Sequence, residues 1–305
     1  MFTLSRREFI AGTIATSLLK TGGLTLADDR PMLRRSIPSS AEELPIIGLG
    51  TARVFNVDDS PGLRAPLKAV LKELLDGGGS VIDTAPSYGM AEGVVGDLVA
   101  GLDHPGKVFL ATKVAANGKE AGLRQIQHSF KDLQTGVVDL YQVHNLRDTK
   151  QQLGLLRELR DEGKIRYIGI THYVDSQHDE LVDWVRREPM DFLQFNYSIA
   201  GRTAEQTLLP LCADQGIATM INRPFQRGRL FRGVKGKALP EWAADFDCHS
   251  WGQFFLKYIA AHPAVTNIIP ATANPKHMLD NIQAGKGGLP DARQRVKMIQ
   301  FVDSL

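Results

Sequence analysis

Four side chains in this sequence could together carry a proton to a reacting oxygen. They are Asp83, Tyr88, Lys113 and His144. A hydride added to a carbonyl carbon leaves an alkoxide that needs a proton, and a tyrosine hydroxyl, with an ordinary pKa near 10, can supply it at neutral pH. A lysine ammonium about 4 Å away would stabilise the resulting phenolate by roughly 4 kcal/mol before desolvation is counted. Asp83 would hold Lys113, and His144 would hydrogen-bond the carbonyl oxygen.

Each of the four side chains also has a structural explanation when it is taken alone. Asp83 could cap a helix, Tyr88 could pack in a loop, Lys113 could lie in solvent, and His144 could be a satisfied polar residue. The four side chains can act together only if the fold brings them to one place. The strands and loops that carry them must therefore be identified.

Short β-rich runs alternate with segments of helical period along the chain, as in the apolar stripe from Leu67 to Leu75. Eight strands, each followed by a helix, predict a single-domain α/β fold, a closed parallel (β/α)8 TIM barrel of about 250 residues. An open doubly wound sheet would alternate in a similar way, but the segment after the first strand, residues 48–53, lacks the third glycine of the dinucleotide fingerprint. The expected strands are Ile46 to Leu49, Ser80 to Asp83, Val108 to Lys113, Val137 to Val143, Ile165 to Ile170, Phe192 to Phe195, Ile217 to Ile221 and Thr266 to Ile269.

The barrel gives the four side chains a common location. In such a fold the carboxyl ends of the strands and the loops after them build the active site. Asp83 ends the second expected strand, and Tyr88 lies in the loop after it. Lys113 ends the third strand and His144 follows the fourth, so all four would meet at one mouth of the barrel.

Seven motifs follow one another in a characteristic order: GLGTA at 48–52, VIDTAPSYG at 81–89, LATKV at 110–114, DLYQVHN at 139–145, IRYIGITHY at 165–173, DFLQFNYS at 191–198 and IIPATANPKHMLDN at 268–281. Through them the chain resembles the aldo-keto reductase family from about residue 46 to 284. The resemblance implies a barrel that binds NADPH, or less often NADH, across its mouth without a Rossmann domain. It also implies an oxidoreductase that acts on the carbonyl or alcohol of a small substrate, with Tyr88 as the general acid or base.

The resemblance further implies which side chains hold the cofactor. The segment from Arg223 to about Asp245 would fold over the pyrophosphate, with Arg223 or Arg227 contacting a phosphate. The positions expected around the nicotinamide are Gly50, Thr51, Asp83, Thr171, His172, Gln194 and Asn196, and those expected around the adenosine are Thr272, His277, Asp280 and Asn281.

Two positions depart from the family pattern. Asn222 stands where members usually carry an aromatic residue that stacks on the nicotinamide, which leaves Phe225 as a substitute. Ala273 stands where many members carry an arginine for the 2′-phosphate, so Lys276 and His277 would have to bind that group. We expect NADP(H) rather than NAD(H), and no metal.

Two other functions fit parts of the pattern. A metal-dependent barrel hydrolase could use Asp83, His144 and His172 as ligands, although the first strand carries no HxH pair. A catalytically silent regulatory barrel would bind the cofactor without turnover. A purely structural module would have no reason to assemble the four side chains.

The first 27 residues have the composition of an export signal. Arg6 and Arg7 precede an apolar run through Leu19, and Thr25 and Ala27 are small residues at the two positions that a signal peptidase reads. The segment resembles a twin-arginine (Tat) signal peptide, which predicts a reductase domain over 28–305, recognition by the Tat export machinery and a periplasmic location. The alternative is an inefficient signal and a working enzyme in the cytoplasm. The apolar run is too short to span a bilayer comfortably, and no other stretch is a credible span.

Charge and cysteine content narrow the partners. Of 36 Lys and Arg and 34 Asp and Glu residues, three basic and one acidic lie in the first 27, so the remainder is balanced. A balanced domain has no basic surface for a phosphate backbone, and nucleic acid is not an expected partner. Cys212 and Cys248, the only cysteines, could pair in an oxidising compartment, but two buried thiols are the favoured state.

Overall fold

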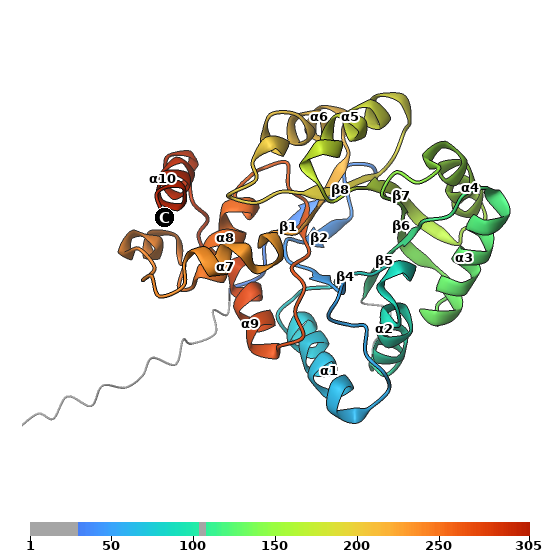
Figure 1. The fold of residues 1–305 in the computed structure, drawn as a ribbon, viewed down its shortest axis with the longest axis horizontal. Coiled ribbons are helices and arrows are strands. Elements are labelled where there is room, and N and C mark those ends of the chain that lie inside the picture. Colours follow the sequence, from blue (N-terminus) through green and yellow to red (C-terminus); the bar gives the residue numbers. More distant parts are fainter. Residues whose placement is uncertain (1–29, 104–107) are drawn as a thin grey trace, which may run out of the picture.

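Eight parallel strands close into a barrel in the computed structural model, which describes residues 30–103 and 108–305 (Figure 1). They are hydrogen-bonded in sequence order from β3 to β10, and the two end strands meet through bridges between Ile47 and Ile268 and between Gly50 and Ala271. A Cβ on Gly50 would lie 2.8 Å from the Ile269 carbonyl oxygen, so this closure needs glycine. The barrel strands are β3 (Leu49–Gly50), β4 (Val81–Asp83), β5 (Phe109–Val114), β6 (Val138–His144), β7 (Ile165–Thr171), β8 (Phe192–Asn196), β9 (Ala218–Asn222) and β10 (Asn267–Ile268).

A helix follows each barrel strand and buries its apolar face against the sheet. In α1 (Pro61–Asp76), Leu67, Val70 and Leu71 are buried because they recur at helical spacing. The start of α8 (Trp251–Ala260) is fixed by Ser250, whose hydroxyl accepts a hydrogen bond from the backbone amide of Gln253. The remaining helices of the ring are α2 (Ala91–Ala100), α3 (Lys119–Asp132), α4 (Thr149–Asp161), α5 (His178–Arg187), α6 (Leu208–Gln215), α8 (Trp251–Ala260) and α9 (Pro275–Ala284).

The inside of the barrel changes from apolar to polar along the strands. Every second residue of a strand faces the same side, so the residues two positions apart form successive layers. The lower layer is an apolar cluster that includes Val81, Ala111, Leu140 and Phe192. Two residues further along these strands the inward side chains are polar, namely Asp83, Lys113, Gln142 and Gln194. The polar layer therefore lies at the carboxyl ends of the strands.

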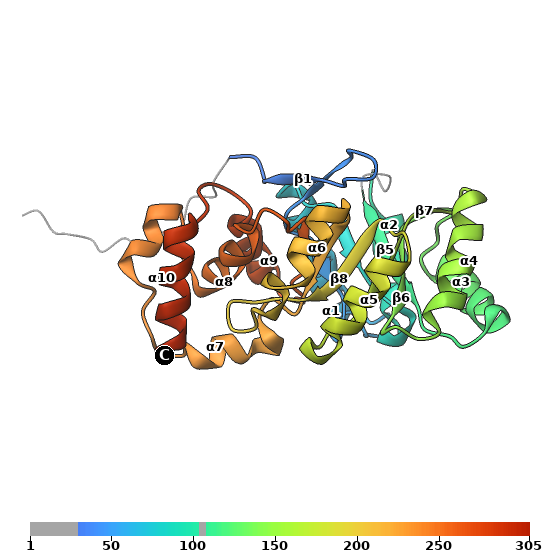
Figure 2. The same ribbon diagram turned by 90° about the horizontal axis from the view of Figure 1, so that it is seen from above.

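A short antiparallel hairpin of β1 (Arg34–Ser36) and β2 (Glu43–Pro45) covers the opposite end of the barrel. Ile37 and Leu44 belong to the interior apolar cluster. Glu42 accepts a hydrogen bond of 2.7 Å from the hydroxyl of Tyr167, near the start of β7. Figure 2 shows β1 on one side of the molecule and α7 (Arg229–Gly233), which follows β9, on the other. The hairpin thus closes the amino ends of the strands and leaves the polar mouth open.

Two additions extend the barrel beside α8 (Figure 1). The segment after β9 contains the 3-10 helix η5 (Gln226–Gly228), α7 (Arg229–Gly233) and the 3-10 helix η6 (Glu241–Phe246), and the chain ends with α10 (Ala292–Asp303). The ring of Phe301 in α10 lies 6.0 Å from that of Trp242 and 6.2 Å from that of Trp251. These aromatic contacts join α10, η6 and α8 into one packed unit.

The observed elements confirm the predicted barrel. Most strand ends differ from expectation by one residue, so that His144 and Asn196 end β6 and β8. Cys212 and Cys248 are buried free thiols. Within residues 30–103 and 108–305, no helix is both long and apolar enough to cross a membrane. The predicted signal at 1–27 lies outside the described residues.

Candidate active site

Lys113 and Asp83 form an ion pair inside the barrel. The ammonium Nζ lies 2.8 Å from Oδ1 and 2.7 Å from Oδ2 of Asp83, and it donates a third bond of 2.7 Å to the Thr84 carbonyl oxygen. The side chains are 1% and 3% exposed. Burial alone would lower the pKa of Lys113, but the Asp83 carboxylate outweighs it and the pKa lies above its ordinary value. Lys113 is therefore a fixed positive charge.

Two glutamines hold the Asp83 carboxylate in place. Nε2 of Gln194 donates to Oδ1 at 2.8 Å, and Nε2 of Gln142 donates to the same atom at 3.4 Å. Thr51 supports the main chain, because its amide and hydroxyl both lie 3.0 Å from the Asp83 carbonyl oxygen. Gln142 was not among the site residues predicted from the sequence. The signal was available, because Gln142 precedes His144 by two residues on one strand and so faces the same way.

Tyr88 ends the 3-10 helix η1 (Pro86–Tyr88) and lies beside the ion pair. Nζ of Lys113 is 5.3 Å from the centre of the Tyr88 ring. Gly89 follows with φ of 67°, and a Cβ there would lie 2.3 Å from Oδ1 of Asn56, so the turn requires glycine. Burial raises the pKa of Tyr88; Lys113 lowers it and Asp83 raises it, and the balance stays above the ordinary value. Lys113 acts in the predicted direction, but burial outweighs it, and Tyr88 is a neutral phenol able to donate a proton.

His144 lies against Tyr88 as a neutral imidazole. Their rings meet edge to face with centres 5.9 Å apart, and only 7% of His144 is exposed. Burial, followed by the charge of Lys113, lowers the pKa of His144 to about 3. Nδ1 of His144 lies 3.4 Å from the Ser87 hydroxyl. A neutral imidazole carries one N–H, which can donate to a substrate oxygen beside the Tyr88 hydroxyl.

Asp83, Tyr88 and His144 line an open cavity of about 700 Å³, a size usual for ligand sites. Lys113 and Thr51 lie behind its wall, bonded to Asp83. The predicted residues that line it are Gly50, Asp83, Tyr88, His144, Thr171, Gln194, Asn222, Arg223, Phe225 and Arg227.

The wall beside Asp83 fits a nicotinamide carboxamide. The Thr171 hydroxyl donates to Oε1 of Gln194 at 2.9 Å, which links it to Asp83. Asn222 donates from Nδ2 to the His172 carbonyl oxygen at 3.2 Å. Its Oδ1 is buried and has no hydrogen-bond partner within the described part of the chain. A buried acceptor without a partner is uncommon, and a carboxamide N–H would satisfy this one.

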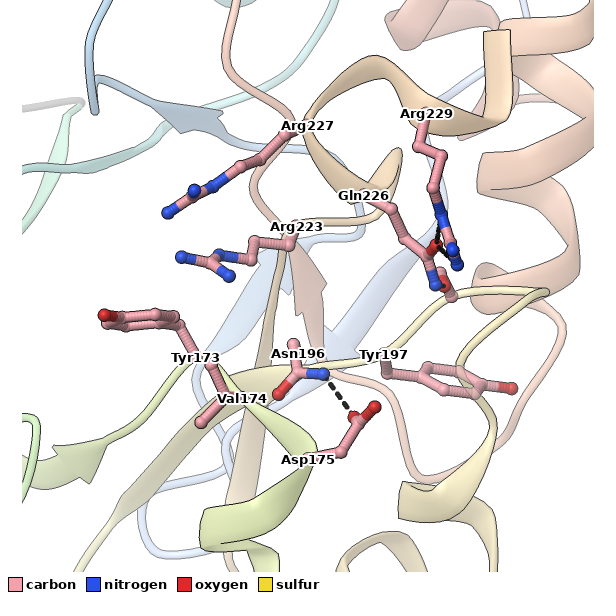
Figure 3. Close-up of a pocket in the computed structure, with 10 residues that line it drawn as sticks. Tyr173, Val174, Asp175, Asn196, Tyr197, Arg223, Gln226, Arg227 and Arg229 are labelled. Atoms are coloured by element: carbon pink, nitrogen blue, oxygen red, sulfur yellow. Dashed lines mark hydrogen bonds between the residues drawn. The ribbon is translucent and has the colours of Figure 1, made fainter. Parts of the chain in front are cut away.

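Asn196 and His172 lie to one side of this wall. Nδ2 of Asn196 donates to Oδ1 of Asp175 at 2.5 Å, and its Oδ1 lies 3.2 Å from Nε2 of His178. Asn196 lines a second, smaller pocket of about 260 Å³, which Figure 3 shows together with Asp175 and Tyr173. The His172 ring stacks on that of Tyr173, with centres 5.2 Å apart.

The residues expected at the adenosine lie on or just before α9, outside the lining of the large cavity. Asp280 is bonded to the start of α8, because Oδ2 accepts from the Ser250 hydroxyl at 2.7 Å and Oδ1 from Nε2 of Gln253 at 2.8 Å. Asn281 and Thr272 are buried, at 4% and 7% exposure. Lys276 and His277 are exposed in the first turn of the helix.

Asp83, His144 and His172, the side chains considered as metal ligands, do not form a metal-binding group. In the part of the chain that the structure describes, no three His, Cys, Asp or Glu side chains are arranged to hold a metal ion. The Asp83 carboxylate is engaged by Lys113 instead.

The comparisons with known proteins agree with the fold. The chain belongs to the aldo/keto reductase family, whose model matches residues 46–299. It is 30% identical to the aldo-keto reductase YhdN of Bacillus subtilis (strain 168) over 70% of this chain and 66% of that protein, just under two thirds of the relative's length. It is also 30% identical to the methylglyoxal reductase YeaE of Escherichia coli (strain K12), over 78% of this chain and 84% of that protein.

A solved structure shares the architecture. The crystal structure of an aldo/keto reductase from Klebsiella pneumoniae in complex with NADP and acetate superposes with a TM-score of 0.74 at 29% identity. The superposition covers 86% of this chain and 93% of that one.

Proposed function

We propose that the protein reduces the carbonyl group of small aldehydes or ketones with NADPH, and that Tyr88 donates the proton. Family membership and the named reductases among the relatives support an NAD(P)H-dependent oxidoreductase. The observation that carries the proposal is the neutral Tyr88 phenol held between the Lys113–Asp83 pair and the neutral imidazole of His144. NADPH, when bound, supplies the hydride.

The four side chains divide the work of protonation. The N–H of His144 donates to the carbonyl oxygen and polarises the bond. The Tyr88 hydroxyl gives its proton to the same oxygen as negative charge develops there. The Lys113 ammonium stabilises the phenolate that remains, and Asp83 keeps the ammonium oriented. Oxidation of an alcohol would use the same groups in reverse.

We propose NADPH rather than NADH as the preferred nucleotide. Relatives of known structure contain NADP or NADPH, which supports this choice, although one curated relative is named an NADH-specific methylglyoxal reductase. Lys276 and His277 are exposed in the first turn of α9, where a helix favours negative charge, and they are the candidate partners of the 2′-phosphate. Lys276→Ala should raise the KM for NADPH about tenfold and leave that for NADH nearly unaltered.

The proposed activity is tested by following absorbance at 340 nm with each nucleotide against a panel of carbonyl compounds. Methylglyoxal and glyoxal belong in the panel because relatives are named as their reductases. Turnover that disappears in Tyr88→Phe, with NADPH binding retained, is the expected result. Nucleotide binding without turnover of any compound would instead indicate the catalytically silent regulatory barrel.

We also propose that residues 1–27 are a twin-arginine signal and that the protein works in the periplasm. The paired Arg6 and Arg7, the apolar run and the small residues before 28 support it. Since that route carries folded proteins, the nucleotide would be acquired in the cytoplasm. Processed protein with bound nucleotide should appear in the periplasm and vanish in Arg6→Lys/Arg7→Lys. Full-length protein confined to the cytoplasm in both forms would overturn the proposal.

A further inference from the structure

Three arginines line the large cavity and have no carboxylate partner among the described residues. They are Arg53 in the loop after β3, and Arg223 and Arg227 in the loop after β9. Among the described residues, Asp83 is the only acidic side chain that lines the cavity, and it is paired with Lys113. Burial, followed by the charges of Arg227 and Arg53, lowers the pKa of Arg223. The cavity therefore gathers positive charges that repel one another and that an anion would relieve.

The backbone at these arginines is strained. Arg53, Arg223 and Arg227 have φ values of 69°, 51° and 55°, in the left-handed region that side chains other than glycine seldom adopt. Such strain is kept where the surrounding structure enforces it, and it clusters at ligand sites. The conformation of all three thus marks this part of the cavity wall as a ligand site, and it is their positive charges that favour an anionic ligand.

Arg223 is directed toward the reacting end of the cavity. Its guanidinium carbon lies 3.8 Å from the centre of the Tyr173 ring. Figure 3 shows the guanidinium groups of Arg223 and Arg227 pointing the same way on the side of Tyr173. Tyr173 follows β7, and the strand order β10-β9-β8-β7 puts β7 on the side of β9 away from β10 and α9. Arg223 therefore leans away from the helix expected to hold the adenosine.

Arg223 also acts on the proton donor. Its charge is among those that lower the pKa of Tyr88, and both side chains line the same cavity. A ligand group bound at Arg223 would thus lie near the carbonyl that Tyr88 protonates.

We propose that the preferred substrates are carbonyl compounds that carry a carboxylate, that Arg223 binds this carboxylate, and that Arg227, the other arginine expected at the pyrophosphate, is the one that serves the cofactor. A guanidinium binds a carboxylate through two parallel N–H bonds, and stacking on Tyr173 holds the group in position before the ligand arrives. The carboxylate is unchanged in the reaction. The hydride adds to the carbonyl carbon, the C=O π bond breaks, and the oxygen takes the Tyr88 proton, so an oxo acid becomes a hydroxy acid as NADPH becomes NADP⁺. This inference rests on the proposed function.

The test compares matched substrates at saturating NADPH: 4-oxobutanoate with butanal, and glyoxylate with glyoxal. The members of each pair have the same number of carbons and differ in the carboxylate. We expect kcat/KM at least about tenfold higher for the acids. Arg223→Asn should raise the KM for the acids about 10- to 100-fold, whereas the values for the neutral members change much less. Asparagine tolerates the left-handed backbone, and Arg223→Lys, which keeps the charge, should recover part of the preference.

Inhibition provides a second measurement. Butanoate should compete with butanal in the wild type and lose that effect in Arg223→Asn. The matched control is Arg232→Ala, which removes an exposed arginine of α7 outside the lining of the cavity and should alter neither the preference nor the inhibition.

Distinct results would overturn the inference. If Arg223→Asn raises the KM for NADPH and affects both members of each pair equally, Arg223 serves the cofactor. If Arg232→Ala reduces the preference for the acids as much as Arg223→Asn does, that preference comes from the net charge of the protein and not from a contact with Arg223. Turnover of neutral aldehydes without preference for the acids would contradict this inference alone, and the absence of turnover with every carbonyl would contradict the proposed function as well.

Discussion

Lys113 and Asp83 face each other inside the barrel with the ammonium 2.7 and 2.8 Å from the two carboxylate oxygens. Removing two charges from water is costly, so a buried pair of this kind adds little net stability compared with apolar residues. It does fix a positive charge 5.3 Å from the centre of the Tyr88 ring. The pair is therefore an arrangement for chemistry, held by Gln194 and Gln142.

Lys113→Met should lower the free energy of unfolding by about 3–5 kcal/mol, because it leaves the Asp83 carboxylate buried and uncompensated. Lys113→Met/Asp83→Asn should recover most of that loss, since neither charge remains. Urea unfolding measures both variants. Turnover should be absent in both variants. The double variant would then recover stability without recovering activity. A double variant no more stable than Lys113→Met would show that the pair is needed for packing and not for its charges.

Tyr88→Phe should reduce kcat about 100- to 10,000-fold, because only the proton donor is removed. The ring and its edge-to-face contact with His144 persist, so the free energy of unfolding and the affinity for NADPH should change little. Steady-state kinetics and quenching of protein fluorescence by NADPH measure the two effects. Retention of more than a tenth of the wild-type kcat would mean that another group protonates the product.

His144 should make the protein less stable as the pH falls below 6.5. Its pKa is about 3 in the folded protein and near 6.5 in the unfolded chain, so between these values only the unfolded chain binds the proton. The contribution of the neutral His144 imidazole to the free energy of unfolding is complete above pH 6.5 and is lost as the pH falls toward 3. Between pH 7 and pH 5 this group should cost about 2 kcal/mol.

Urea unfolding at these two pH values tests the role of His144. His144→Gln should lose about 2 kcal/mol less than the wild type between pH 7 and pH 5. The control is His249→Gln, which alters an exposed histidine with no ion pair among the described residues and should keep the wild-type dependence. Equal pH dependence in all three proteins would show that the buried imidazole does not resist protonation.

The barrel and the proton-transfer residues were accessible from the sequence because both follow from periodic rules. Lys113 is the last residue but one of β5 and His144 ends β6, and the carboxyl ends of parallel strands meet at one mouth whatever the sequence distance between them. The hairpin of β1 and β2 was not predicted, since each strand has only three residues and cannot display a period of two.

The surroundings of the cofactor residues were less accessible. Asn196 and Asp280 were both expected at the nucleotide from the family resemblance. In the structure Asn196 is bonded to Asp175, and Asp280 to Ser250 and Gln253. These partners belong to neighbouring loops and helix ends, whose approach depends on loop conformation and leaves no periodic trace in the sequence.

The contacts that attach α10 to the barrel could not be predicted from the sequence either, because the residues that make them are far apart along the chain. Nη2 of Arg295 donates to Oε1 of Glu205 at 2.6 Å and to the Tyr197 hydroxyl at 2.8 Å. Glu205 ends the 3-10 helix η4 (Thr203–Glu205), and it also accepts from the Tyr258 hydroxyl of α8 at 2.6 Å. One carboxylate thus joins α10 to α8 and to the loop after β8.

Arg295→Met should lower the free energy of unfolding at pH 7 by about 1–3 kcal/mol. The Glu205 carboxylate would stay charged but would lose the guanidinium, and only the two tyrosine hydroxyls would still donate hydrogen bonds to it. Burial raises the pKa of Glu205, but hydrogen bonds from Tyr197 and Tyr258 and the charge of Arg295 outweigh it, so the pKa lies below 4.5. The stability from this carboxylate is present above pH 4.5 and lost as the pH falls through the lower folded value. The difference between wild type and variant in urea unfolding should therefore shrink at pH 3.

The control is Arg293→Met, at an exposed position of the same helix, which should match the wild type at both pH values. If Arg293→Met lowered the free energy of unfolding as much as Arg295→Met, the contact with Glu205 would have no role of its own.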